Sequence, residues 1–136
     1  MKKIIFILFT LSFTVSFSQN ITVNETFTPQ QLIENILVNS GCVSVSNFSA
    51  SGGNFGAGQL SYGYFNANGS AFPFQEGIVL STGKINSAVG PNSNFSDDGN
   101  GIGWTGDSDL NAALGLSNTF NASVLEFDFV PNANNI

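Results

Sequence analysis

The sequence predicts a mainly β fold, an antiparallel β-sandwich or jelly-roll-like domain, with one helix at its N-terminal end. Two features carry this prediction. Apolar residues recur at helical spacing before Gly41 and at every second position after it. Short connectors rich in Gly, Asn and Ser separate the alternating segments, as turns do. A chain of 136 residues has room for a single domain of this kind.

The N-terminal segment, residues 1–18, has the order of a secretory signal peptide. Two lysines come first, residues 4–17 are rich in Phe, Ile and Leu, and Ser16 and Ser18 supply small residues before a cleavage position at Gln19. The apolar run is shorter than the ~20 residues that a membrane-spanning helix needs. We therefore expect a secreted or cell-surface protein whose mature domain covers residues 19–136 and retains no stable membrane span.

A helix is predicted over residues 29–40. Thr28, Pro29 and Gln31 form the start signal, because Thr and Gln three residues apart make a capping box and Pro suits the first helical position. Four apolar residues share one face at helical spacing: Leu32, Ile33, Ile36 and Leu37. Gly41 provides the stop. Such an apolar face predicts a helix that covers a sheet.

Strands are predicted where apolar and polar residues alternate or form a short apolar run. These segments are residues 43–46, 60–65, 77–82 and 125–130. In the last of them Leu125, Phe127 and Phe129 share the face expected to be buried, opposite Glu126 and Asp128.

The strand count also predicts that the domain is incomplete. The segment after the last strand, residues 131–136, has no strand pattern. Four or five strands would leave sheet edges and an apolar face uncovered. We therefore expect a truncated domain, of which further strands would be the missing part.

Composition excludes several kinds of chemistry. The chain has no His, which removes triad-type nucleophile activation and imidazole metal ligation. A lone cysteine, Cys42, forms no disulfide framework and no multi-cysteine zinc site. We expect Cys42 to be a small buried residue at the start of a strand.

Charge narrows the class of partner. Lys84 is the single cation of the mature part, against nine acidic residues. This balance repels nucleic acid and anionic membrane surfaces and attracts cations such as calcium. The partner is expected to be a surface polymer or another protein.

An acidic, glycine-rich stretch at residues 97–109 is the candidate ion site. Its oxygen-bearing side chains, the type that calcium prefers, are those of Asp97, Asp98, Asn100, Asp107 and Asp109. The stretch lacks the spacing of an EF-hand. The alternative is that its Asp and Gly residues form turns and that Asp107 or Asp109 caps a short helix over residues 110–114.

Two further sets of side chains could bind or act on a sugar. Trp104 has polar neighbours and is the candidate ligand-stacking residue, although core burial would also explain it. Glu76, Glu126 and Asp128 are candidate carboxylates for glycoside hydrolysis. A solvated strand face explains Glu126 and Asp128 more simply, because no cation lies nearby in the sequence to tune them.

Several segments together resemble the choice-of-anchor L domain. They are residues 61–66 (SYGYFN), 76–83 (EGIVLSTG), 106–110 (GDSDL) and 124–131 (VLEFDFVP). The resemblance runs from about residue 31 to residue 131 and implies an exported bacterial surface protein. In that family the domain continues with further strands and an acidic segment, which agrees with the expected truncation. The Phe- and Asn-rich, Arg-free N-terminal region also resembles those of the Bacteroidetes, in which such domains often precede a type IX secretion sorting domain.

The function predicted from these observations is non-enzymatic. We expect an exported surface domain that serves adhesion or display within a larger multidomain protein and that calcium could stabilise. The alternatives are a carbohydrate-binding module that uses Trp104 and a fragment of a glycoside-active enzyme.

Overall fold

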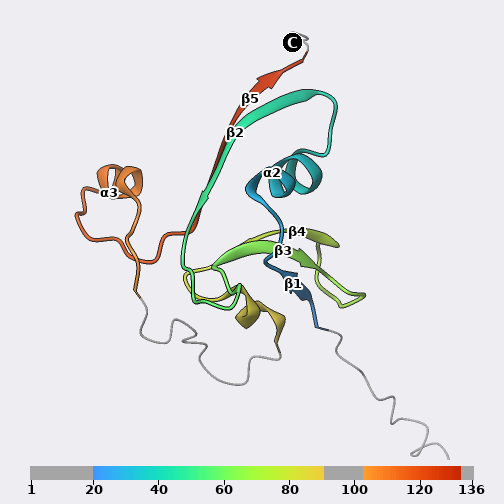
Figure 1. Cartoon of the computed structure of the whole chain (residues 1–136), viewed down its shortest axis with the longest axis horizontal. Helices are drawn as coiled ribbons and strands as arrows, with labels where there is room; N and C mark the ends of the chain where they lie inside the picture. The colour runs from blue at the N-terminus through green and yellow to red at the C-terminus, as the bar shows by residue number, and fades with distance from the viewer. Residues whose placement is uncertain (1–19, 91–102, 133–136) are drawn as a thin grey trace, which may run out of the picture.

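The strands form two antiparallel sheets (Figure 1) in a computed structural model that describes residues 20–90 and 103–132. The first sheet has the order β1 (Thr22–Asn24), β3 (Tyr62–Asn66), β4 (Glu76–Leu80), and the second pairs β2 (Val43–Ser51) with β5 (Val124–Pro131). The helical elements are α2 (Pro29–Gln31), η1 (Leu32–Val38), η2 (Ile85–Val89) and α3 (Ser108–Leu114). The architecture confirms the predicted mainly β fold with a leading helix.

The leading helix begins where the capping signal predicts. The Gln31 backbone N–H donates to Thr28 Oγ1 at 3.2 Å, and the Thr28 N–H donates to Gln31 Oε1 at 2.9 Å. Pro29 occupies the first helical position. All of these contacts lie within four consecutive residues, so the local sequence alone specifies them.

The end of this helix differs from the prediction. After one α-helical turn the chain continues as a π-helix over η1, and the Asn39 N–H donates to Glu34 O, five residues earlier. Asn39 ends the helix in the left-handed conformation at φ 30°, so the predicted stop at Gly41 is wrong. The wider i→i+5 turn rotates Leu37 off the apolar face, and this side chain is 56% exposed.

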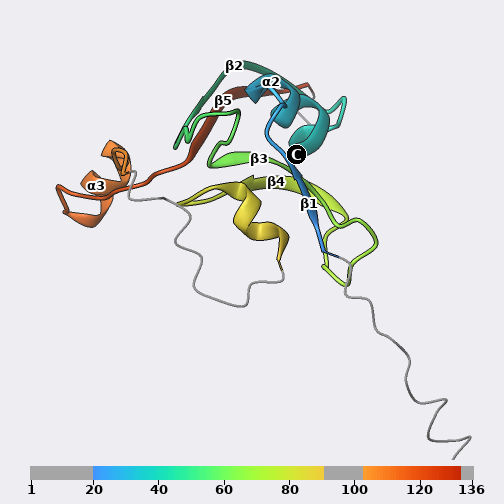
Figure 2. The same cartoon turned by 60° about the horizontal axis from the view of Figure 1, so that its bottom comes forward.

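The helix lies between the two sheets. Figure 1 shows α2 between the ribbon of β2 and β5 and the strands β3 and β4, and in Figure 2 it again lies above β3 and β4. Segment η1 contacts β2, β3 and β4. Leu32 and Ile33 are completely buried there. The prediction that the apolar side of this helix covers a sheet is confirmed. The helix packs against both sheets.

The three-stranded sheet is tightly packed around Gly63 of β3. A Cβ atom at this position would lie 2.6 Å from Asn24 O of β1 and 2.7 Å from Ile85 Cδ1 of η2. Glycine therefore allows β1 and η2 to approach β3 closely. Ile85 is completely buried at this contact.

The two-stranded ribbon carries a β-bulge. The register of β2 against β5 shifts between Ser46 and Ser49, and Asn47 adopts a left-handed φ of 53°. Along β5 the alternation is as predicted for Leu125 and Phe127, which are half-buried, and for Glu126 and Asp128, which are exposed.

Two residues are less buried than expected. Phe129, expected on the buried face, is 63% exposed, because α2 and η1 pack on β2 and leave this end of β5 uncovered. Cys42, expected to be buried, is an exposed free thiol in the turn between η1 and β2. Cys42 lies just before β2, its carbonyl accepts the Asn132 N–H, and no segment of the described residues packs over its side chain.

Candidate functional site

A chain of hydroxyl groups joins the start of β5 to the end of β4. The Gly53 N–H donates to Ser61 Oγ at 2.8 Å, and Ser123 Oγ donates to Ser81 O at 2.6 Å. The two hydroxyl oxygens of Ser61 and Ser123 are 2.6 Å apart. Because the Ser123 hydrogen is used on Ser81, Ser61 is the donor of the central bond. Ser61 is completely buried, so this chain fixes the junction of the two sheets.

Trp104, near the start of the described segment 103–132, is hydrogen-bonded to the residues just before β5, beside the junction of the two sheets. Its indole Nε1–H donates to Ala122 O at 2.7 Å, and its backbone N–H donates to Asn121 Oδ1 at 3.1 Å. The ring meets Phe55 edge-on, with centroids 5.6 Å apart, and Gly53 leaves room for it. Trp104 is therefore half-buried and held at several points. Its predicted sugar-stacking role remains a prediction.

Asp107 caps α3, as one of the two alternatives predicted. Its Oδ1 accepts the Leu110 N–H at 2.7 Å, and its own N–H donates to Thr119 Oγ1 at 3.2 Å. The Thr119 N–H in turn donates to Asn111 Oδ1 at 3.0 Å. These bonds close the segment from Asp107 to Thr119 into a compact unit that carries α3 (Figure 1).

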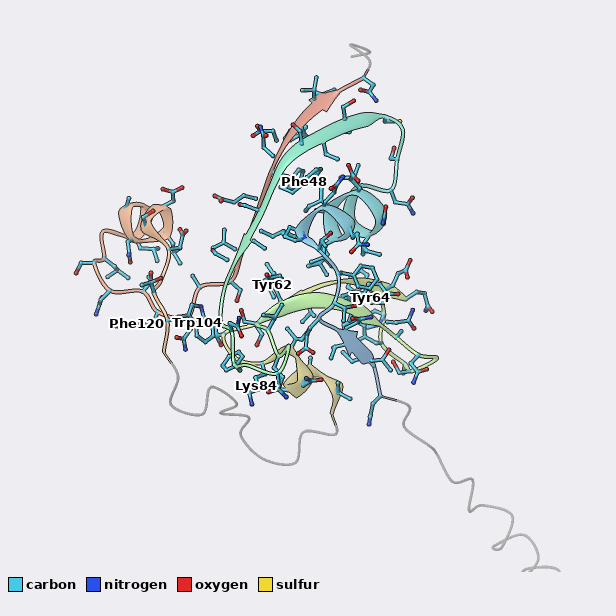
Figure 3. All side chains as sticks on the ribbon, viewed as in Figure 1. Phe48, Tyr62, Tyr64, Lys84, Trp104 and Phe120 are labelled. Atoms are coloured by element: carbon cyan, nitrogen blue, oxygen red, sulfur yellow. The ribbon has the colours of Figure 1, made fainter. Side chains whose placement is uncertain are left out.

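A groove of about 620 Å³ lies between this unit, the end of β4 and the start of β5. Its apolar lining includes Leu80, Leu110 and Phe120, which are 48%, 46% and 71% exposed. Asp107 and Asp109 line it as well. Figure 3 shows Phe120 beside Trp104 at this end of the molecule. The groove thus combines exposed apolar surface with carboxylates.

Only two of the five predicted calcium ligands belong to the described residues. Asp97, Asp98 and Asn100 lie outside them. Asp107 and Asp109 lie at the start of α3, on the groove. Within residues 20–90 and 103–132 no three Cys, Asp or Glu side chains gather as a metal-binding group would. Calcium binding by the predicted set therefore remains a prediction.

The three predicted carboxylates are divided between the two sheets. Glu76 is on β4, where its Oε2 accepts the Tyr64 hydroxyl hydrogen at 2.6 Å. Glu126 and Asp128 are neighbours on the exposed face of β5, and each accepts a hydrogen bond from β2, from Ser49 at 3.2 Å and Asn47 at 2.5 Å respectively. Glu126 and Asp128 are brought together and Glu76 is not.

The hydrogen bond to Glu76 raises the pKa of Tyr64 above its ordinary value of 10.0, while a hydrogen bond from Asn66 lowers it and burial adds a smaller rise. The native state thus favours the neutral phenol. Its stabilising contribution is complete below pH 10.0 and is lost as pH rises through the raised pKa. We expect Glu76→Gln to lower the pKa of Tyr64, measured by tyrosinate absorbance in a Tyr62→Phe background. An unchanged titration would contradict the assigned cause.

Lys84 contacts an aromatic ring, which its sequence position did not indicate. Its Nζ lies 5.6 Å from the centroid of the Phe55 ring. Phe55 thereby contacts both Lys84 and Trp104. The exposure of Leu80 and Phe120 in the groove was also missed, since Leu80 belongs to a short apolar run that predicts a strand and Phe120 belongs to no periodic segment.

Comparison with known proteins identifies a family. No curated protein and no solved structure matches the chain. Among the described residues no helix is long and apolar enough to cross a membrane. A family match covers residues 20–136, which includes all of the elements described above. The chain belongs to the Choice-of-anchor L domain family.

Proposed function

We propose that this chain is a non-enzymatic domain of an exported protein and that it serves adhesion or display at the cell surface, as part of a larger multidomain protein. The family match over residues 20–136 carries the proposal, because the family is one of surface-anchored proteins. The predicted signal peptide supports the proposed export. It lies outside the described residues.

The geometry of the carboxylates supports a binding role over a catalytic one. Glu126 and Asp128 are exposed, and each is bonded to a polar side chain of β2. The only cation of the described residues, Lys84, contacts Phe55 instead. A general acid normally needs a neighbour or a buried setting that shifts its pKa. The exposed apolar residues of the groove suit contact with another molecule.

Export is tested on cells that make the full chain with a C-terminal epitope tag. We expect antibody to label intact cells or the medium to contain the protein, with Gln19 as its N-terminal residue by mass spectrometry. A matched chain that lacks residues 1–18 should stay inside. Tag that is accessible only after lysis of cells making the full chain would contradict the proposal.

Stabilisation by calcium is the finer part of the proposal. A ligand that binds only the native state at a hundredfold excess over its Kd raises the free energy of unfolding by about 2.7 kcal/mol. We therefore expect the exported chain to melt at a higher temperature in excess calcium than in chelator. Asp109→Asn should reduce this difference, whereas Glu34→Gln, an exposed acid on η1, should preserve it. Identical melts in calcium and chelator would refute calcium binding.

A further inference from the structure

A second groove, the hairpin groove, lies where three segments meet: the residues just before β1, the loop between β3 and β4, and the end of η2. Its volume is about 360 Å³, and its lining includes Asn20, Ser70, Phe72 and Val89. Small-molecule sites have volumes of about 300–1,000 Å³. The hairpin groove shares no lining residue with the groove beside α3, so it is a separate feature of the surface.

Hydrogen bonds join the three walls of the hairpin groove. Asn20 Nδ2 donates to Gly90 O at 3.0 Å, which links the residues before β1 to the end of η2. Asn68 Nδ2 donates to Asn20 O at 3.4 Å, which links the loop between β3 and β4 to the same residue. Within that loop the Ser70 N–H donates to Ala67 O at 2.8 Å. The groove is therefore already formed without a ligand, as binding sites usually are.

Phe72 is the aromatic wall of the hairpin groove. Its ring meets the Phe65 ring edge-to-face, with centroids 5.4 Å apart and an interplanar angle of 84°. Phe65 lies against Gly77 of β4, where a Cβ atom would be only 2.8 Å from Phe65 Cε1. The Phe72 N–H donates to Ser70 Oγ at 3.3 Å. Phe72 nevertheless remains 42% exposed, so a ring held by packing still offers surface to the groove.

Two polar groups in the same lining have hydrogen-bonding capacity left. Within residues 20–90 and 103–132, no group donates to Asn20 Oδ1, and the Ser70 hydroxyl hydrogen has no acceptor. Asn20 thus supplies an acceptor and Ser70 a donor. Both side chains belong to half-buried residues. The hairpin groove therefore combines one aromatic ring with a donor and an acceptor.

The lining of the hairpin groove carries no charge. The groove beside α3, in contrast, is lined by Asp107, Asp109 and Glu126. The net charge of −6 on the whole chain repels polyanions, and a lining without carboxylates has no group that attracts a cation. Charge complementarity therefore favours an uncharged ligand.

The shape and polarity of the lining favour a sugar among uncharged ligands. A sugar ring presents C–H groups on its face, which suit the electron-rich face of an aromatic ring, and hydroxyl groups around its rim. A proline-rich peptide also packs on aromatic rings, but it docks in grooves lined by aromatic side chains. Of the described residues that line the hairpin groove, Phe72 alone is aromatic.

We propose that the hairpin groove binds a neutral sugar residue of a surface polysaccharide. The C–H face of the sugar lies against Phe72, one of its hydroxyl groups donates to Asn20 Oδ1, and another accepts the Ser70 hydroxyl hydrogen. This site is distinct from Trp104, whose indole N–H is already bonded to Ala122 O. The inference supplies a ligand class for the adhesive role proposed above and rests on it for biological meaning.

The test titrates the full chain, collected after export, in a calorimeter. The probes are neutral oligosaccharides of glucose, mannose, xylose and galactose, together with oligogalacturonate, the acidic counterpart of the galactose probe, and a proline-rich peptide. We expect at least one neutral oligosaccharide to bind at least about tenfold more tightly than oligogalacturonate and the peptide.

Variants of the loop between β3 and β4 locate the binding site. Phe72→Leu keeps an apolar side chain against Phe65 but removes the ring, and should weaken binding of that oligosaccharide by at least about tenfold. Phe72→Tyr keeps the ring and should retain binding. Ser70→Ala removes the donor and should also weaken it. Phe74→Ala is the matched control, because Phe74 is 66% exposed on the same loop but does not line the groove, and binding should not change. Circular dichroism checks the folding of each variant.

Four results would overturn the proposal. These are no binding of any neutral oligosaccharide, equal affinities of Phe72→Leu and Phe72→Tyr, and tighter binding of the proline-rich peptide, which would assign the groove to a protein partner. The fourth is binding that is lost in Trp104→Phe but retained in Phe72→Leu, which would assign the sugar to Trp104. An exported chain that binds no oligosaccharide overturns this inference alone, whereas a chain that binds one but is not exported overturns the proposed function alone.

Discussion

Replacing Leu32 with alanine is expected to lower the free energy of unfolding by about 2–5 kcal/mol, because it leaves a cavity where the helix meets both sheets. Leu32 is completely buried. The fully buried apolar residues of the described ranges are few: Leu32, Ile33, Ala67 and Ile85. Few other fully buried apolar side chains are therefore present to move into the cavity left by Leu32→Ala. Urea unfolding followed by Trp104 fluorescence measures the change.

Leu37→Ala provides the matched control for this prediction. It removes the same atoms from the same helix, but Leu37 is 56% exposed. We expect its effect to stay within about 0.5 kcal/mol, the usual range for surface substitutions. Equal losses for the two variants would contradict the π-helical register of η1, since a regular α-helix would place Leu37 on the buried face.

Ser61→Ala is expected to lower the free energy of unfolding by about 1–3 kcal/mol, the usual effect of leaving a buried polar group without a partner. The substitution deprives the Gly53 N–H of its acceptor and Ser123 Oγ of its donor. Both groups lie at the junction of β4 and β5, and Ser61 is completely buried.

The control for Ser61 is Ser44→Ala. Ser44 also uses its hydroxyl, donating to Asn132 Oδ1 at 2.6 Å, but water can replace this exposed bond. We expect a change within about 0.5 kcal/mol in the same urea experiment. A loss for Ser61→Ala no larger than that for Ser44→Ala would show that the hydroxyl chain does not hold the sheets together.

Local features of the fold could be predicted from the sequence. The helix start at Thr28 and Pro29 depends on contacts between residues at most three positions apart. The exposed side of β5 follows from alternation alone, which turns Glu126 and Asp128 to one face. The cap at Asp107 was one of two roles that its sequence position allowed, and the structure contains it.

Features that depend on distant segments could not be predicted. The π-helical turn that exposes Leu37 has no signal in the helical spacing of η1. The hydroxyl chain joins Ser61 to Ser123, 62 positions away, in a chain where serine is common. In the candidate site, the acidic, glycine-rich stretch indicated Asp107 and Asp109, but no pattern in the sequence indicated Phe120 or Leu80, which share a groove with them.

The sequence by itself determined the family, the β-rich fold class, the acidic charge and the face on which each residue of β5 lies, because each follows from composition, order or a period of two. Only the tertiary structure decided that Leu80 and Phe120 share a groove with Asp107 and Asp109, and that serine hydroxyls join the two sheets. These features depend on which segments become neighbours. Packing decides that, and spacing along the chain does not record it.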